Sequence, residues 1–214
     1  MVAGSLTTCE EPDFTLLGTP LVPAAEALPQ PVFRVPVVDR CNPLLAVFVD
    51  VDVPAQPEFN VVWKDEDFPI PLVDELYDGE RWSGYFRLTF SFPFVGFDMG
   101  SGGFNRRADI EAFAYQLDEA GDVVAIVFAH TYSAGQTWNV LRVRHRSAVV
   151  PIEAFEMVDG RPVIYVNTWN HMFSNENTNP GLELIEHSAA RTFSGSRGEV
   201  EGFYQAVWNG KASP

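Results

Sequence analysis

Two carboxylates, Asp109 and Glu111, stand two residues apart in a segment of strand-like sequence. In a strand they share a face, and with a rise of about 3.4 Å per residue their Cα atoms are about 7 Å apart. Two such groups beside an apolar surface can hold a cation between them, or can differ in pKa enough to act as acid and base. We expect both to be catalytic and to be candidate metal ligands. The alternative is an exposed strand end whose charges are merely solvated.

Two histidines follow segments of strand-like sequence. His130 follows alternating apolar residues, and His171 lies beyond an apolar run that begins at Pro162. Histidine titrates near neutral pH, and its ring nitrogens bind metals. We expect His130 and His171 to reach the same sheet rim as Asp109 and Glu111 and to be catalytic. A hydrogen-bonded core or rim histidine is the alternative in each case.

The stretch from Arg161 to Leu184 places many hydrogen-bonding side chains beside strand hydrophobics. Strands that end in Asn, Trp and His often project these groups over a sheet rim, where ligands bind. Strand alternation predicts that Asn167, Trp169 and His171 share one face with Tyr165. Beyond them, Asn175 to Asn179 is expected to form a turn-rich lid. The residues expected to bind substrate are Tyr165, Asn167, Trp169, Asn170, Trp138 and Tyr115.

Other chemical motifs are few. The sequence contains no Gly-x-Ser-x-Gly, His-Glu-x-x-His or reactive-cysteine pattern, which removes the commonest hydrolase signatures. His145 stands among Arg142, Arg144 and Arg146 in a cationic strip that could hold a carboxylate or a phosphate. The alternative is a solvent-facing strand that neutralises an acidic surface. His187 is expected at the surface of a short late helix.

The charge balance limits the partners. Of 214 residues, 29 are acidic and 14 are Lys or Arg, which gives a net charge of -15. This argues against nucleic acid or an anionic membrane as a partner, whereas a solvated anionic surface is a common route to solubility. No apolar run approaches the roughly 18 residues that span a membrane. We expect a soluble protein with a small-molecule ligand and no integral membrane segment, cytoplasmic if the N-terminus is native and secreted if a signal peptide has been removed.

The composition indicates a single folded domain. A hydrophobic fraction of 46%, including 17 Phe, is enough for a substantial core. Residues 1–31 carry five prolines and are expected to form an extended arm, with 32–214 as one β domain. Cys9 and Cys41 allow one disulfide or two free thiols.

Turn-bounded strands dominate the rest of the chain. The predicted fold is all-β, a single-domain antiparallel β-sandwich or partly closed barrel with an extended Pro-rich N-terminal arm. A short helix is expected at 71–77 and a glycine-rich loop at 98–104. The expected strands are 32–38, 44–53, 82–97, 109–117, 123–131, 137–144, 149–157, 163–170 and 199–208.

The order of these elements resembles a known superfamily over about residues 105–173. A strand with Asp109-x-Glu111 is followed by a hairpin strand ending in His130, and then by Arg161-Pro-Val-Ile-Tyr-Val ending near His171. This order is similar to that of the group joining the necrosis-inducing cytolysin-like proteins and the vacuolar-protein-sorting-62-like proteins.

The resemblance implies a β-sandwich with an acidic rim pocket for a divalent cation, Ca²⁺ or Mg²⁺. In the cytolysin branch this cation serves binding of a sphingolipid sugar headgroup. Asp109 and Glu111 match the carboxylates of the family's Asp-Trp-Glu. His130 matches its His after the second strand, and His171 its His beyond the Pro-Val-x-Tyr strand. The family's preceding His falls on Ala108 and its Trp on Ile110, so one expected ligand is absent, which favours a site adapted to small-molecule chemistry.

The leading hypothesis is a non-redox enzyme of small-molecule metabolism, of lyase, cyclase or hydrolase type. It would use acid/base chemistry, with or without a metal ion, in an aromatic-lined cleft. The alternative is a cation-dependent protein that binds a glycan or lipid headgroup without turnover. A third hypothesis is an accessory protein whose Asn-rich loop contacts a partner.

Overall fold

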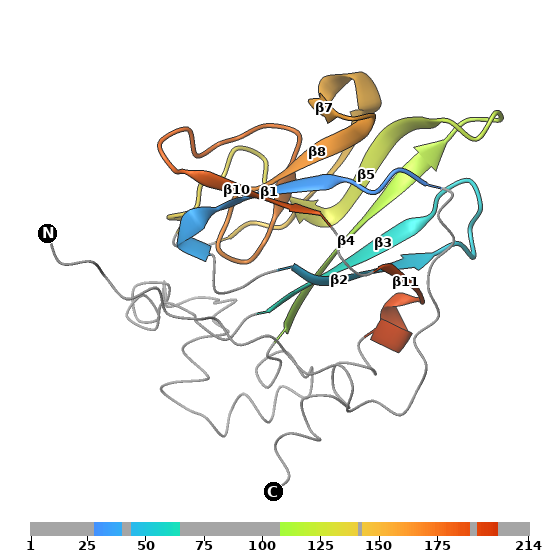
Figure 1. The fold of residues 1–214 in the computed structure, drawn as a ribbon, viewed down its shortest axis with the longest axis horizontal. Coiled ribbons are helices and arrows are strands. Elements are labelled where there is room, and N and C mark those ends of the chain that lie inside the picture. Colours follow the sequence, from blue (N-terminus) through green and yellow to red (C-terminus); the bar gives the residue numbers. More distant parts are fainter. Residues whose placement is uncertain (1–27, 40–43, 65–107, 141–142, 189–191, 201–214) are drawn as a thin grey trace, which may run out of the picture.

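The computed structural model describes residues 28–39, 44–64, 108–140, 143–188 and 192–200. These residues are nearly all β, and one mixed sheet curls into a half-barrel (Figure 1). The expected all-β fold, a sandwich or partly closed barrel, is therefore confirmed. One detail is wrong: the sheet is not antiparallel throughout. Three pairs of strands are parallel: Val32–Pro36 with Arg161–Val166, Leu44–Asp50 with Thr192–Ser194, and Val123–Tyr132 with Phe173–Ser174.

The sheet order in the described residues is β10-β1-β8-β9-β5-β4-β3-β2-β11, with β6 beside β5 and β7 beside β8. Two short 3-10 helices accompany the strands: η2 (Val37–Asp39) and η5 (Ile152–Ala154). The strands are β1 (Val32–Pro36), β2 (Leu44–Asp50), β3 (Glu58–Lys64), β4 (Ala108–Leu117), β5 (Val123–Tyr132), β6 (Arg146–Pro151), β7 (Met157–Val158), β8 (Arg161–Val166), β9 (Phe173–Ser174), β10 (Leu184–Ser188) and β11 (Thr192–Ser194).

The hairpin of β4 and β5 forms where the sequence predicts it. The side chain of Asp118 accepts hydrogen bonds from the backbone N–H groups of Ala120 and Asp122, which closes the turn. Gly121 lies in the left-handed region at φ 88°, where a residue without Cβ is favoured. Beyond the turn, Tyr115 pairs with Ile126 and Ala114 with Val127 in antiparallel register.

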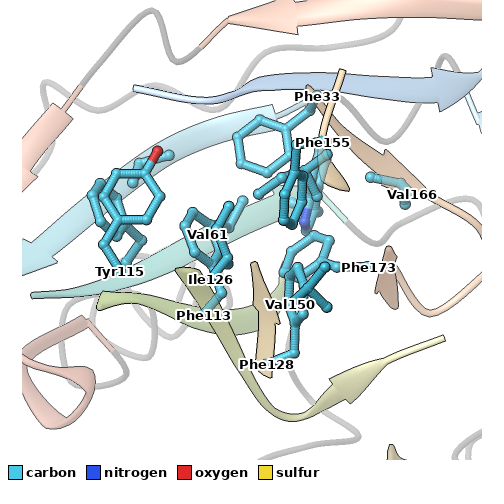
Figure 2. Close-up of a cluster of buried hydrophobic side chains, with 14 of the residues drawn as sticks. Phe33, Val61, Phe113, Tyr115, Ile126, Phe128, Val150, Phe155, Val166 and Phe173 are labelled. Carbon is cyan, nitrogen blue, oxygen red and sulfur yellow. The ribbon is translucent and has the colours of Figure 1, made fainter. Parts of the chain in front are cut away.

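An aromatic core fills the inner face of the curled sheet (Figure 2). Phe113 of β4 lies at its centre and contacts Phe33, Phe59, Phe128 and Phe173 with ring centroids 4.9 to 6.3 Å apart. These five rings come from five different strands, so Phe113 packs against side chains of four other strands of the sheet.

Tyr115, expected to bind substrate, lies in this core. Its ring is fully buried against Phe59, and its hydroxyl donates to the carbonyl oxygen of Pro29. Burial raises the pKa of Tyr115 well above its usual range, so the hydroxyl remains a hydrogen-bond donor.

Several predicted boundaries are wrong for local reasons. The strand expected to reach Val53 ends at Asp50, whose carboxylate accepts from the N–H of Asp52 and starts a turn. Residues 137–140 form a turn closed by the bond from the N–H of Val140 to the carbonyl of Thr137, not a strand. The strand expected at 149–157 breaks at Pro151, where η5 begins.

Other elements depart from the sequence pattern more completely. Strand β3 has no counterpart among the predicted strands. Residues 184–188 form a strand, β10, rather than the expected late helix. Residues 197–200 form a helical turn, so the strand expected from 199 does not begin there. The arm at 1–27, Cys9 and Cys41, the helix at 71–77, the strand at 82–97 and the loop at 98–104 lie outside the described residues.

The helical segments of the described residues are all short. None of them has the length and apolar character that crossing a bilayer requires.

Replacement of Phe113 by Ala should lower the free energy of unfolding by about 3 to 5 kcal/mol, because the cavity would adjoin five other rings. Val124→Ala on the solvent side of β5 should change it by less than about 0.5 kcal/mol. Urea unfolding followed by tryptophan fluorescence measures both. Equal midpoints for the two variants would contradict the packing in Figure 2.

Candidate functional site

A buried histidine bridges two aspartates at one rim of the sheet. The Nδ1 of His171 lies 2.8 Å from Oδ2 of Asp109, and its Nε2 lies 2.9 Å from Oδ2 of Asp39. The side chain of His171 is fully buried, whereas those of Asp39 and Asp109 are 5% and 15% exposed. We call this arrangement the Asp39–His171–Asp109 array.

The strand register explains why these residues meet. Strands β1 and β8 run parallel, so the residues after both strands, Asp39 and His171, emerge at the same edge. Strands β3 and β4 run antiparallel, so Trp63 near the end of β3 pairs with Asp109 near the start of β4. The two edges join where the imidazole of His171 stacks on the indole of Trp63, with centroids 5.0 Å apart and ring planes 6° apart.

A tight turn aims His171 into the protein. Strand β8 ends at Val166, and the N–H of His171 donates to the carbonyl of Thr168. The hydroxyl of Thr168 donates to the side-chain oxygen of Asn170 and accepts from the N–H of Met172. His171 itself has φ 58°, an unfavourable value for a residue with a Cβ, which the surrounding bonds must maintain.

This turn breaks the expected alternation between Tyr165 and His171. Tyr165 lies on the face of β8 opposite the core residues Ile164 and Val166. Its hydroxyl donates to Glu156 and accepts from Arg34, which is also ion-paired to Glu156. His171 is in the core, so the prediction that the two share a face is wrong.

The array carries a buried positive charge. Each ring nitrogen of His171 faces a carboxylate oxygen, and only the doubly protonated imidazolium donates to both. Burial alone lowers the pKa of His171, but the charges and hydrogen bonds of Asp39 and Asp109 outweigh it and raise that pKa to about 10. At neutral pH the ring is therefore an imidazolium, and its stacking on Trp63 adds a cation–π attraction.

A second histidine contacts the same tryptophan. His187 of β10 meets Trp63 edge to face, with centroids 6.3 Å apart. Burial lowers the pKa of His187, and the nearby charge of Asp39 opposes that shift only in part. His187 is therefore neutral where His171 is charged. The expectation of a surface histidine on a helix is wrong.

Glu111 lies one step further along the inner face of β4 from Asp109. In the register with β3, Asp109 pairs with Trp63 and Glu111 with Val61, and both β3 residues face the core. The prediction that the two carboxylates share a face is thus confirmed. Glu111 is half-buried.

His130 lies at an irregular point of β5. It is exposed, it has φ 65°, and the pairing of β5 with β6 is interrupted around it. Its N–H donates to the hydroxyl of Ser147, and its carbonyl accepts from Nδ1 of His145. These described contacts are on the β6 side and do not include the array. Its catalytic role stays a prediction.

Asn167 is a buried connector between two loops. Its amide donates to the hydroxyl of Ser133 and to the carbonyl of Glu176, and its side-chain oxygen accepts from the N–H of Thr178. The amide of Asn179 donates to the backbone carbonyl of Asn167. Both polar atoms of the Asn167 side chain are hydrogen-bonded within the protein, and these bonds hold the two loops together.

The remaining predicted binding residues lie in or beside the loops that Asn167 joins. The N–H of Trp138 donates to the side-chain oxygen of Asn179. The indole N–H of Trp169 donates to the carbonyl of Val140. The side-chain oxygen of Asn170 accepts the hydrogen bond from the hydroxyl of Thr168 in the turn after β8. Their roles in substrate binding stay predictions.

Three residues of the site escaped the sequence analysis: Asp39, Trp63 and His187. Asp39 follows an apolar strand directly, which is the pattern that drew attention to His171. Trp63 ends the run Glu58–Lys64, whose alternation matches a strand. His187 carried no comparable signal, because the acidic residues around it also suit a helix.

The described residues contain no group of three or more His, Cys, Asp or Glu side chains arranged to hold a metal ion. In the array both nitrogens of His171 donate to carboxylates, so neither has a lone pair for a metal. No protein-family model, curated protein or solved structure matches the chain. The geometry of the site is therefore the basis for its interpretation.

The raised pKa of His171 predicts a specific pH dependence of stability. The pKa is about 10 in the folded protein and about 6.5 in the unfolded chain, so the folded state binds the proton more tightly. This contribution is complete below about pH 6.5 and is lost as the pH rises toward 10. The wild type should therefore lose unfolding free energy over this range, measured by urea unfolding.

A His171→Gln variant should lack that loss and should be less stable by about 3 to 5 kcal/mol at neutral pH, because two carboxylates lose their cation. His130→Gln serves as the exposed control and should keep the wild-type profile. An NMR titration in which the His171 ring loses its proton near pH 6.5 would refute the charged array.

Proposed function

We propose that this protein is a non-redox enzyme that performs acid/base chemistry on a small molecule at the rim holding the Asp39–His171–Asp109 array. The array carries the proposal. A buried imidazolium held between two carboxylates costs desolvation energy that an apolar core would avoid, and such strongly perturbed groups concentrate at functional sites.

In this proposal Asp109 is the group that touches the substrate. It has the most exposed side chain of the array, and the 2.8 Å bond from His171 fixes its orientation. His171 and Asp39 act through it as positioning residues. Because His171 is already protonated at neutral pH, it serves as a fixed hydrogen-bond donor, and the proton acceptor is the carboxylate of Asp109.

Glu111 is the second participant. It shares the inner face of β4 with Asp109 and pairs with Val61 of β3. Two carboxylates in environments of different polarity can take the roles of base and acid. We assign Asp109 to proton removal and Glu111 to proton return, a division that suits lyase, cyclase or hydrolase chemistry.

Asp109→Asn should abolish turnover while binding persists, because the amide keeps the shape but cannot accept a proton. A ligand is first identified by thermal shift against a small-molecule library. Wild type and variant are then incubated with it in D₂O, and product or deuterium incorporation is followed by mass spectrometry. The wild-type rate should exceed that of Asp109→Asn by about 10² to 10⁴.

Two controls sharpen this comparison. Asp118→Asn removes a carboxylate from the β4–β5 turn and should leave the rate unchanged. Asp39→Asn should lower the rate less than Asp109→Asn, because Asp39 acts only through His171. If the wild type returned its bound ligand chemically unchanged and without deuterium, the enzyme proposal would fail.

A second candidate function is cation-dependent binding of a glycan or lipid headgroup without turnover. It is favoured by the shared face of Asp109 and Glu111, since carboxylate oxygens are the ligands that Ca²⁺ and Mg²⁺ prefer. The cation would rest on these two groups rather than on His171, whose nitrogens are occupied.

This candidate predicts that Ca²⁺ raises the melting temperature of chelator-treated protein and that Asp109→Asn loses the effect. It also predicts Ca²⁺-dependent sedimentation with vesicles bearing glycosylated sphingolipid. Glu153→Gln on η5 is the charge-matched control and should respond as the wild type does. A melting temperature indifferent to both chelator and Ca²⁺ would exclude this function.

A further inference from the structure

A hollow of about 550 Å³ lies on the β5–β6 side of the protein, apart from the array. This volume is within the range of about 300 to 1,000 Å³ typical of small-molecule sites. The polar side chains of its lining belong to two arginines, one tyrosine, one serine and one glutamine. The lining residues are Tyr132, Ala134, Gln136, Val140, Arg144, Arg146 and Ser147.

The arginines of this hollow are unusual in a protein of net charge -15. Arg144 and Arg146 are both exposed, and neither forms an ion pair with another described residue. Arg34, by contrast, is bonded to both Glu156 and Glu186. A guanidinium stays charged at any physiological pH, so the hollow presents two positive charges that no carboxylate of the described residues pairs with.

The backbone that carries these arginines is held firmly. The side-chain amide of Gln136 forms two hydrogen bonds with the backbone of Arg144. Its oxygen accepts from the backbone N–H of Arg144 at 2.6 Å, and its nitrogen donates to the backbone carbonyl of Arg144 at 2.8 Å. Further along, His145 and Ser147 bond the backbone of His130. The main chain is thus fixed on both sides of Arg144 and Arg146, while their side chains remain available.

Two other lining residues, Gln136 and Val140, are held by hydrogen bonds from the segment that follows β8. The hydroxyl of Thr178 donates to the carbonyl of Gln136, and the indole of Trp169 donates to the carbonyl of Val140. Asn167 bonds Ser133 at the start of the same loop. Several side chains that the sequence marked for ligand binding therefore shape this hollow.

Tyr132 is the aromatic residue of the lining. Its ring stacks on the buried ring of Phe128, with centroids 5.7 Å apart, and its backbone pairs with Phe173. The ring is therefore rigid and offers an apolar surface beside the arginines. The hydroxyl of Ser147 accepts from His130 and keeps its own proton to donate.

We propose that this hollow binds the phosphate or carboxylate group of a small molecule, with Arg144 and Arg146 as the anion ligands and Tyr132 as the apolar contact. Guanidinium groups match both oxyanions in bidentate geometry. The net charge of -15 repels extended polyanions, so a small anion is favoured over nucleic acid or an anionic membrane.

The test titrates inorganic phosphate and, separately, citrate into the full chain, with amide NMR shifts and calorimetry as readouts. We expect saturable binding, with shifts centred on residues 132–136 and 144–147. The double variant Arg144→Gln/Arg146→Gln should bind at least about a hundredfold more weakly, because both charge-assisted bonds to the anion are lost. The arm that binds more tightly identifies the oxyanion.

Arg161→Gln removes one positive charge at the β7–β8 hairpin and should bind as the wild type does, which separates the site from overall charge. Asp109→Asn should also bind normally, so failure of the proposed catalysis leaves this result intact. Overlapping amide spectra away from the hollow verify that the double variant is folded. Absence of saturable binding, or equal affinity in wild type and double variant, would overturn the proposal.

Discussion

The rest of the described structure depends on one buried charge, the imidazolium of His171. Its two hydrogen bonds join a residue after β1 to a residue of β4, and its ring rests on Trp63 of β3. Removing such an ion from water is costly, and the cost is offset only when the partners are close and well oriented. The turn after β8, the left-handed φ of His171 and the register of β3 with β4 all serve that requirement.

The aromatic core and the polar rim are parts of one arrangement. Trp63 belongs to the core through its contact with Phe33, yet its face carries His171. Phe173, two residues after His171, packs on Phe33, Phe113 and Phe128. The rigidity of these rings fixes the rim side chains, which is what a catalytic group requires of its support. Charge and packing are thus joined through a short segment of chain.

The sequence was sufficient where local rules govern the structure. The β4–β5 hairpin, the shared face of Asp109 and Glu111 and the all-β class follow from alternation and turn chemistry. It was insufficient where contacts with residues distant in the sequence determine the structure. Val166 ends β8 because Thr168 and Met172 bond across a turn, and this moved His171 away from Tyr165. The role of Asp39 depends on its hydrogen bond to a histidine 132 positions later in the chain. No sequence periodicity predicts a contact over that distance.

That separation has a kinetic consequence. The bonds of the array span 62 and 132 residues, and β1 pairs with β8 and β10, which come from the far end of the described chain. Loops of this length are slow to close, and proteins rich in such contacts fold slowly. During synthesis Asp39 and Asp109 emerge well before His171. The rim therefore stays incomplete until most of the described chain has emerged, and its closure is a late event of folding.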